Sequence, residues 1–183
     1  MPKTAIKQAQ TTQYQAMNKD LANKAKTALL AEMQKQGIQP GYLAFIMPQL
    51  AVETGGFESR ASSVNNLSGM VWVGQKVAYN SGIAKPKGEK PGTYAGYKSL
   101  DLWAKDYLYT LQKMGALAAK NIDDFAAILK SKGYYEADQS IYKKALNSWL
   151  PQLKKMFTDI DFTAPKILVP VMLILLLTII IIK

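Results

Sequence analysis

One stretch limits the fold of this chain more than any other, an apolar segment that reaches a glutamate and then two glycines. It is Leu-Ala-Val-Glu-Thr-Gly-Gly-Phe, residues 50–57. Glycine adopts the positive φ at which helices end, so the pair predicts the end of a buried helix just after Glu53. The partial negative charge of a helix end and apolar neighbours such as Val52 and Phe57 both disfavour an anion there. We expect a carboxyl pKa raised toward neutrality, as a general acid for glycosidic bonds requires, with a solvated helix end as an equal alternative.

Histidine and cysteine are both absent from the 183 residues. Their absence excludes disulfides, thiolate chemistry, a Ser-His-Asp triad and a zinc site of the usual type. Acid–base chemistry near pH 7 is therefore left to carboxylates, tyrosine or lysine. We expect no metal and no cofactor.

The net charge is +10, from 23 basic and 13 acidic residues. Such a balance favours anionic partners such as cell-wall polymer, a phospholipid surface or nucleic acid. The lysines are scattered, and Arg60 is the only arginine, which argues against specific recognition of bases or phosphates. We therefore expect no specific nucleic-acid partner.

Apolar residues at three- and four-residue steps predict a mainly α-helical domain. The predicted helices cover residues 4–36, 41–54, 100–114, 122–131 and 140–157. Pro48 is expected to kink or restart the second helix, Ser99 to cap the third, and Pro151 to interrupt the last. Between the second and third helices, β-prone runs at residues 70–73 and 93–97 predict a small β-hairpin lobe.

Together these motifs resemble the glucosaminidase (glycoside hydrolase 73) group of the lysozyme-like superfamily, which cleaves peptidoglycan. The resemblance covers roughly residues 40–150. It is carried by Glu-Thr-Gly-Gly-Phe-Glu-Ser at 53–59, Asn65-Asn66, Gly69, residues 94–106, and Lys132-Gly133-Tyr134 followed by Tyr142. It implies an α+β, lysozyme-like fold that is mainly α-helical, with the hairpin lobe as one wall of a sugar cleft.

The resemblance also implies catalytic roles. Glu53 corresponds to the general acid, and Tyr134 to a tyrosine beside it, with Tyr135 as the rival for that place. Some relatives carry a second catalytic glutamate in the hairpin, which makes Glu89 the candidate here and Glu58 a weaker one. A solvated loop charge is an equal interpretation of Glu89.

Substrate contacts are expected from Asn65, Asn66, Trp72, Tyr97 and Tyr135. The two asparagines either shape the cleft wall or hold a loop, and the aromatic rings of Trp72 and Tyr97 either stack on sugars or pack within the hairpin.

The expected activity is cleavage of β-1,4 bonds in the glycan strands of peptidoglycan. Two-carboxylate hydrolysis needs a partner for Glu53. Substrate-assisted hydrolysis or a lytic transglycosylase reaction, in which a hydroxyl of the sugar closes on the anomeric carbon, needs Glu53 alone. A non-catalytic envelope or virion protein that binds glycan is the alternative from another class. The sequence does not determine which bond is cut.

Residues 167–182 form a charge-free run between Lys166 and Lys183. As a helix it would span about 24 Å, short of the ~30 Å hydrocarbon core, although flanking lysines and local thinning can make up the difference. We expect a lysozyme-like domain at residues 1–160, a linker at 161–166 and a C-terminal transmembrane anchor at 167–183.

The chain starts without the apolar core of a secretory signal, so an anchored domain would be expected to stay on the cytoplasmic side, away from peptidoglycan. A bacteriophage with an internal membrane resolves this conflict, because its capsid encloses a vesicle whose cytoplasmic face is turned outward. We therefore expect either a virion membrane, with capsid proteins as partners, or a bacterial membrane.

Overall fold

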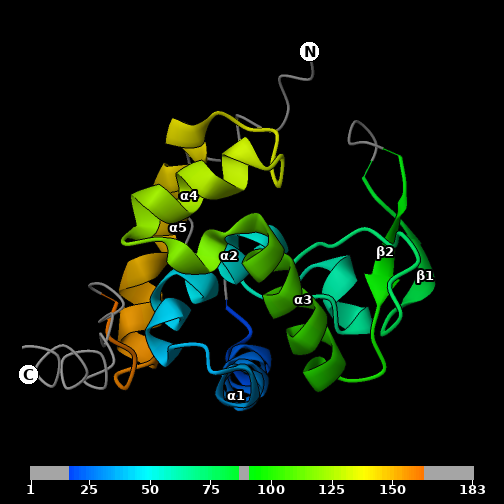
Figure 1. The fold of residues 1–183 in the computed structure, drawn as a ribbon, viewed down its shortest axis with the longest axis horizontal. Helices are drawn as coiled ribbons and strands as arrows, with labels where there is room; N and C mark the ends of the chain where they lie inside the picture. The colour runs from blue at the N-terminus through cyan, green and yellow to red at the C-terminus, as the bar shows by residue number, and fades with distance from the viewer. Residues whose placement is uncertain (1–16, 87–90, 163–183) are drawn as a thin grey trace, which may run out of the picture.

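The computed structural model describes residues 17–86 and 91–162. Within them, five α-helices and a two-stranded sheet follow one another along the chain (Figure 1). The helices are α1 (Lys19–Gln36), α2 (Leu43–Thr54), α3 (Leu100–Met114), α4 (Ile122–Ser131) and α5 (Gln139–Met156). The strands are β1 (Tyr79–Ala84) and β2 (Thr93–Gly96), and 3-10 turns cover Pro40–Tyr42, Arg60–Val64 and Ala116–Ala118. The predicted helical domain with a small hairpin lobe is confirmed.

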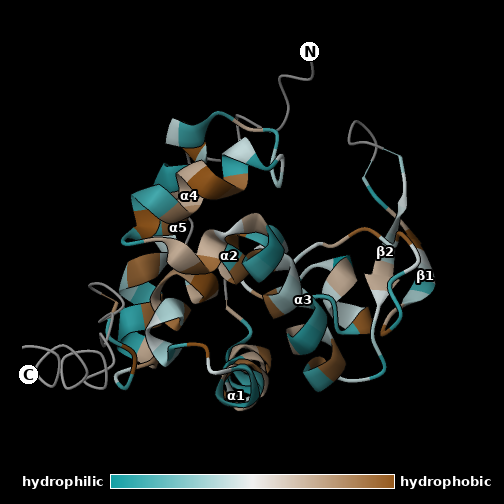
Figure 2. Cartoon of the chain, in the orientation of Figure 1, coloured by the Kyte–Doolittle hydropathy of each residue, from teal (hydrophilic) through white to brown (hydrophobic). Residues whose placement is uncertain are grey.

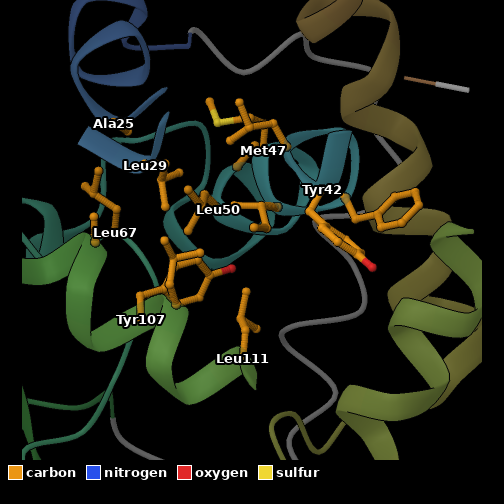
Figure 3. Packing of buried hydrophobic residues seen from close by; sticks show 14 of the residues in the cluster. Ala25, Leu29, Tyr42, Met47, Leu50, Leu67, Tyr107 and Leu111 are labelled. Atoms are coloured by element: carbon orange, nitrogen blue, oxygen red, sulfur yellow. The ribbon is translucent and has the colours of Figure 1, made fainter. Parts of the chain in front are cut away.

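Helix α2 is the buried centre of the domain. All residues from 42 to 51 are buried, as expected for a helix that is apolar on every side. It packs against α4 and α5, while α1 packs against α3. Figure 3 shows Met47 and Leu50 of α2 in one cluster with Leu29 of α1 and Tyr107 of α3. The outer helices α4 and α5 instead carry both hydrophilic and hydrophobic residues (Figure 2).

Four of the five described helices, all except α2, begin at polar caps. The side chains of Asn18, Ser99, Asn121 and Asp138 each accept a hydrogen bond from a backbone N–H in the first turn that follows. The cap predicted at Ser99 is therefore confirmed. Helix α1 begins at Lys19, and the part of the predicted first helix before residue 17 lies outside the described residues.

The first strand of the hairpin lies later in the chain than predicted. Of residues 70–73, Val71 pairs with Tyr94 in an isolated bridge, and the strand that pairs with β2 is Tyr79–Ala84. Its antiparallel register places Tyr79 opposite Gly96. The sequence Tyr-Asn-Ser-Gly-Ile-Ala has poor β propensity, so pairing with β2 decides its conformation.

Two prolines lie within continuous helices, which corrects the restart expected at Pro48 and the interruption expected at Pro151. Helix α2 runs through Pro48 and α5 through Pro151. A proline inside a helix costs about 3 kcal/mol or more. The buried faces of α2 and α5 pack against each other and offset that cost.

The described chain remains attached to the domain beyond α5. Phe157 is buried, and the carboxylate of Asp159 forms an ion pair with Lys26 of α1 at 2.8 Å. Within residues 17–86 and 91–162, no helix is both long and apolar enough to span a membrane. The anchor predicted at residues 167–183 and most of its linker lie outside the described residues.

Candidate active site

Glu53 lies in the last turn of α2, because Gly55 ends the helix with a φ of 58°. Thr54 fixes the turn that follows. Its hydroxyl donates to the carbonyl of Leu50 at 2.6 Å and accepts from the N–H of Phe57 at 2.7 Å. Glu53 itself is half-buried. The helix end therefore holds this carboxylate at the boundary between the core and the surface.

Tyr142 of α5 binds the carboxylate directly. Its hydroxyl donates to Oε1 of Glu53 at 2.7 Å, and its side chain is 5 % exposed. Burial, and then the charge of Glu53, raise the pKa of Tyr142 far above its ordinary value, so it stays protonated and can donate throughout the neutral range. Sequence reasoning gave Tyr142 no role. The one signal was its place after Tyr134 in the resemblance.

Two further tyrosines lie close to Glu53. Burial, and then the charge of Glu53, raise the pKa of both Tyr107 and Tyr134. Tyr134 follows α4, and its hydroxyl donates to the carbonyl of Ser68 at 2.8 Å. Tyr107 on α3 donates to the side-chain oxygen of Gln49, one turn before Glu53 on α2. Tyr142 thus binds Glu53 directly, whereas Tyr107 and Tyr134 lie within the reach of its charge and bind neighbouring groups.

The loop at residues 65–70 brings its backbone to the other carboxylate oxygen. A β-carbon on Gly69, which has a φ of 66°, would lie 3.7 Å from Oε2 of Glu53. The indole N–H of Trp103, on α3, donates to the hydroxyl of Ser68 at 3.0 Å. Oε1 therefore faces α5 and Oε2 faces this loop.

Asn66 holds the loop in shape from inside the protein. Its Oδ1 accepts from the N–H groups of Ser68 at 3.3 Å and Met70 at 3.1 Å. Its Nδ2 donates to the carbonyls of Met70 at 2.7 Å and Ala95 at 2.9 Å. Asn66 is fully buried, so the substrate contact predicted for it does not fit this structure. Its amide is instead used to join the loop to β2.

Tyr135 supports Tyr142. The two rings stack with centroids 3.7 Å apart and planes 11° apart. The Tyr135 hydroxyl donates to the carbonyl of Ala126 at 2.9 Å, and Lys130 lies over its ring at 5.4 Å. The structure thus places Tyr134, and not Tyr135, at the loop beside Glu53. Contact of Tyr135 with substrate stays a prediction.

The other predicted substrate residues belong to the hairpin lobe. Tyr97 is 1 % exposed and donates to the carboxylate of Asp106 at 2.7 Å, so its ring offers no surface to a sugar, and that prediction does not fit. Asn65 is half-buried and donates to the carbonyl of Tyr97 at 2.9 Å. Trp72 is 38 % exposed, so a sugar can still reach its ring.

The two candidates for a second carboxylate are placed differently. Glu58 is exposed in the turn after α2, and Glu89 lies outside the described residues, so its catalytic role stays a prediction. Within the described part of the chain, no group of three or more acidic, histidine or cysteine side chains could hold a metal ion.

A surface hollow of about 380 Å³ lies elsewhere, between α1 and α3. Neither Glu53 nor the tyrosines line it. Its walls are Asn23, Lys24, Thr27, Ala28, Leu100 and Asp101. The candidate site is therefore defined by its chemistry and not by this hollow.

Replacing Tyr142 with Phe is expected to lower turnover about tenfold, because the carboxylate loses its charge-assisted hydrogen bond while the ring stack on Tyr135 remains. Initial rates of peptidoglycan cleavage, the activity expected from the sequence, measure the effect for the parent and the variant. Ser140→Ala, in the first turn of α5 and away from Glu53, is the control and should retain the parental rate. Equal rates for parent and Tyr142→Phe would contradict the role of this hydrogen bond.

The helices, the hairpin and the helix-end glutamate together define a lysozyme-like fold. Solved structures share it, among them a peptidoglycan hydrolase mutant from Sphingomonas sp. A1, with a TM-score of 0.52 at 18 % identity, covering 77 % of this chain and 99 % of that one. The glycoside hydrolase domain of Salmonella typhimurium FlgJ has a TM-score of 0.53 at 21 % sequence identity, and the match covers 77 % of this chain and 91 % of that one. The catalytic domain of the autolysin Auto from Listeria monocytogenes has a TM-score of 0.52 at 17 % sequence identity, and the match covers 83 % of this chain and 93 % of that one.

Comparisons with protein-family models and with curated proteins gave no match. At these identities the structural likeness establishes the fold, and function has to be argued from the site.

Proposed function

We propose that this protein cleaves β-1,4-glycosidic bonds in the glycan strands of peptidoglycan, with Glu53 as the general acid. The observation that carries the proposal is the carboxylate at the end of α2, bound through Oε1 by Tyr142 and flanked at Oε2 by Gly69. The fold, shared with domains described as a peptidoglycan hydrolase, a glycoside hydrolase and an autolysin, supports the substrate class by analogy.

The two oxygens of Glu53 have different roles in this proposal. Because Oε1 accepts the Tyr142 hydrogen bond, the acidic proton resides on Oε2, on the side of the loop at residues 65–70. From there it is transferred to the oxygen of the leaving sugar as the glycosidic bond breaks. The hydroxyl of Tyr134, beside the same loop, faces the positive charge that develops on the sugar ring.

Two routes follow bond cleavage. In the first, Glu89 acts as the second carboxylate, and either takes a proton from the attacking water or attacks the anomeric carbon itself. In the second, Glu53 works alone, and either the N-acetyl group of the substrate or a sugar hydroxyl attacks the anomeric carbon. The proton of an attacking hydroxyl then passes to the Glu53 carboxylate, which has just given up its own.

Digestion of purified peptidoglycan by the full-length chain, with products analysed by mass spectrometry, tests the proposal. Anhydro-muropeptides would identify a lytic transglycosylase. Hydrated products with a reducing N-acetylglucosamine end would identify a glucosaminidase, and those ending in N-acetylmuramic acid a muramidase. Binding to the wall without any cleavage would overturn the enzymatic proposal in favour of a glycan-binding structural protein.

We further propose that residues 167–182 anchor the enzyme in a lipid membrane, either in a bacterial cell or inside a bacteriophage virion. The support is the charge-free run between Lys166 and Lys183. Flotation with lipid vesicles should carry the full-length chain to the top of a gradient and leave a chain ending at residue 162 at the bottom. Absence of the protein from purified virions, in a lysate that contains it, would rule out the virion.

A further inference from the structure

A buried amide lies directly beneath the general acid. Gln49 precedes Glu53 by four residues, so their side chains share one face of α2, one turn apart. The side chain of Gln49 is 0 % exposed, in the middle of an otherwise apolar helix. Burying an amide costs free energy unless its polar atoms form hydrogen bonds. The chemistry proposed above gives Gln49 no role.

The oxygen of this amide connects Glu53 to the loop at residues 65–70. Oε1 of Gln49 accepts the hydrogen bond from Tyr107. The Tyr107 ring stacks on Trp103, with centroids 5.5 Å apart and planes 9° apart. Trp103 in turn donates to the hydroxyl of Ser68. Gln49 is thus linked, through the stacked rings of Tyr107 and Trp103, to Ser68 in the loop.

The nitrogen of the amide makes no hydrogen bond. Nε2 of Gln49 is buried and has no partner among the described residues. An unpaired buried donor costs free energy, so the hydrogen bond between Oε1 and Tyr107 is the polar interaction that accounts for an amide at this position.

We propose that Gln49 is a positioning residue for the general acid, because its amide oxygen holds Tyr107 and, through Trp103 and Ser68, the loop that places Gly69 beside Glu53. The inference rests on the proposed function. A neutral amide suits this place, since it accepts the hydrogen bond of Tyr107 without adding a second charge beside the carboxylate.

The test uses three variants of the full-length chain: Gln49→Met, Tyr107→Phe and the double variant. Gln49→Met keeps the side-chain length but leaves the Tyr107 hydroxyl without its acceptor, and so is expected to lower the melting temperature. The double variant removes both polar partners, a change that is often close to neutral for stability. It therefore separates the effect of folding from the effect of positioning.

For the double variant we expect a melting temperature close to that of the parent, a kcat about 10- to 100-fold lower and a KM within about twofold. Soluble peptidoglycan fragments serve as the substrate. If the double variant recovers the kcat of the parent as well as its melting temperature, the proposal is overturned and Gln49 has a structural role only. A kcat of Gln49→Met equal to that of the parent would also overturn the proposal.

A second readout does not depend on cleavage. The ¹³Cζ NMR shift of Tyr134, whose hydroxyl donates to the carbonyl of Ser68, should change in Gln49→Met and in Tyr107→Phe alike, because both variants break the link between α2 and the loop that carries Ser68. An unchanged Tyr134 signal in Gln49→Met would overturn the inference. If the parent itself cleaves no peptidoglycan, the proposed function fails, and this signal still decides whether Gln49 acts on Tyr134.

Discussion

Replacing Glu53 with Gln should lower the rate of peptidoglycan cleavage by about 10³-fold or more, the upper part of the range for removal of a general acid. Glutamine has the shape of the protonated acid, and its Oε1 can still accept the hydrogen bond from Tyr142. It cannot, however, give a proton to the leaving sugar. The melting temperature should therefore stay close to that of the parent while muropeptide release, followed by mass spectrometry, falls to background.

The control for this prediction is Asp20→Asn. It changes the net charge by the same amount, so it corrects for altered attraction to an anionic wall. Asp20 is exposed on α1 and pairs with Lys24 at the surface, an interaction worth little for stability. It should cleave at the parental rate. A Glu53→Gln variant that keeps more than a tenth of the parental rate would show that another group supplies the proton.

Asn66→Ala should cause the largest loss of stability among the site residues, about 3 kcal/mol of unfolding free energy. Five hydrogen bonds disappear at once, and the carbonyls of Met70 and Ala95 lose a partner from the interior. Because the same loop places Gly69 beside Glu53, cleavage should fall as well. Urea unfolding followed by circular dichroism measures the first effect, since the midpoint shifts in proportion to stability.

The neighbouring asparagine provides a matched control. Asn65 is half-buried, has a φ of 57° and makes one side-chain hydrogen bond, to the carbonyl of Tyr97. Asn65→Gly keeps the favourable backbone conformation and should cost only about 1 kcal/mol. Equal losses for the two variants would mean that the loop, and not the buried amide of Asn66, determines the stability.

The parts of the fold that could be predicted from sequence depend on local signals. Ser99 caps α3, and the glycines after Thr54 end α2, because each acts within one helical turn. The first strand of the hairpin was predicted wrongly, since residues 70–73 are β-prone and Tyr79–Ala84 is not. Pairing with β2 determines which segment forms the strand, and this pairing cannot be seen in the sequence of either segment alone.

The site shows the same division. Glu53 could be found from its own neighbours, whereas the roles of Tyr142 and Gln49 depend on packing between elements far apart in the sequence. Tyr142 reaches Glu53 across 89 residues, and Tyr107 reaches Gln49 across 58. For Asn66 and Tyr97 the residue type suited both a sugar contact and an internal bond. Only their burial distinguishes these roles.

The distance along the chain between Glu53 and Tyr142 also affects when the enzyme becomes active during its synthesis. At about 5–20 residues per second, the ribosome adds the 89 residues between them in roughly 4–18 s. Throughout that interval the nascent chain carries the acid without the tyrosine that binds it, and α5 cannot pack against α2. If this enzyme cleaves the wall, its activity is therefore withheld until the last helix of the domain has emerged and folded.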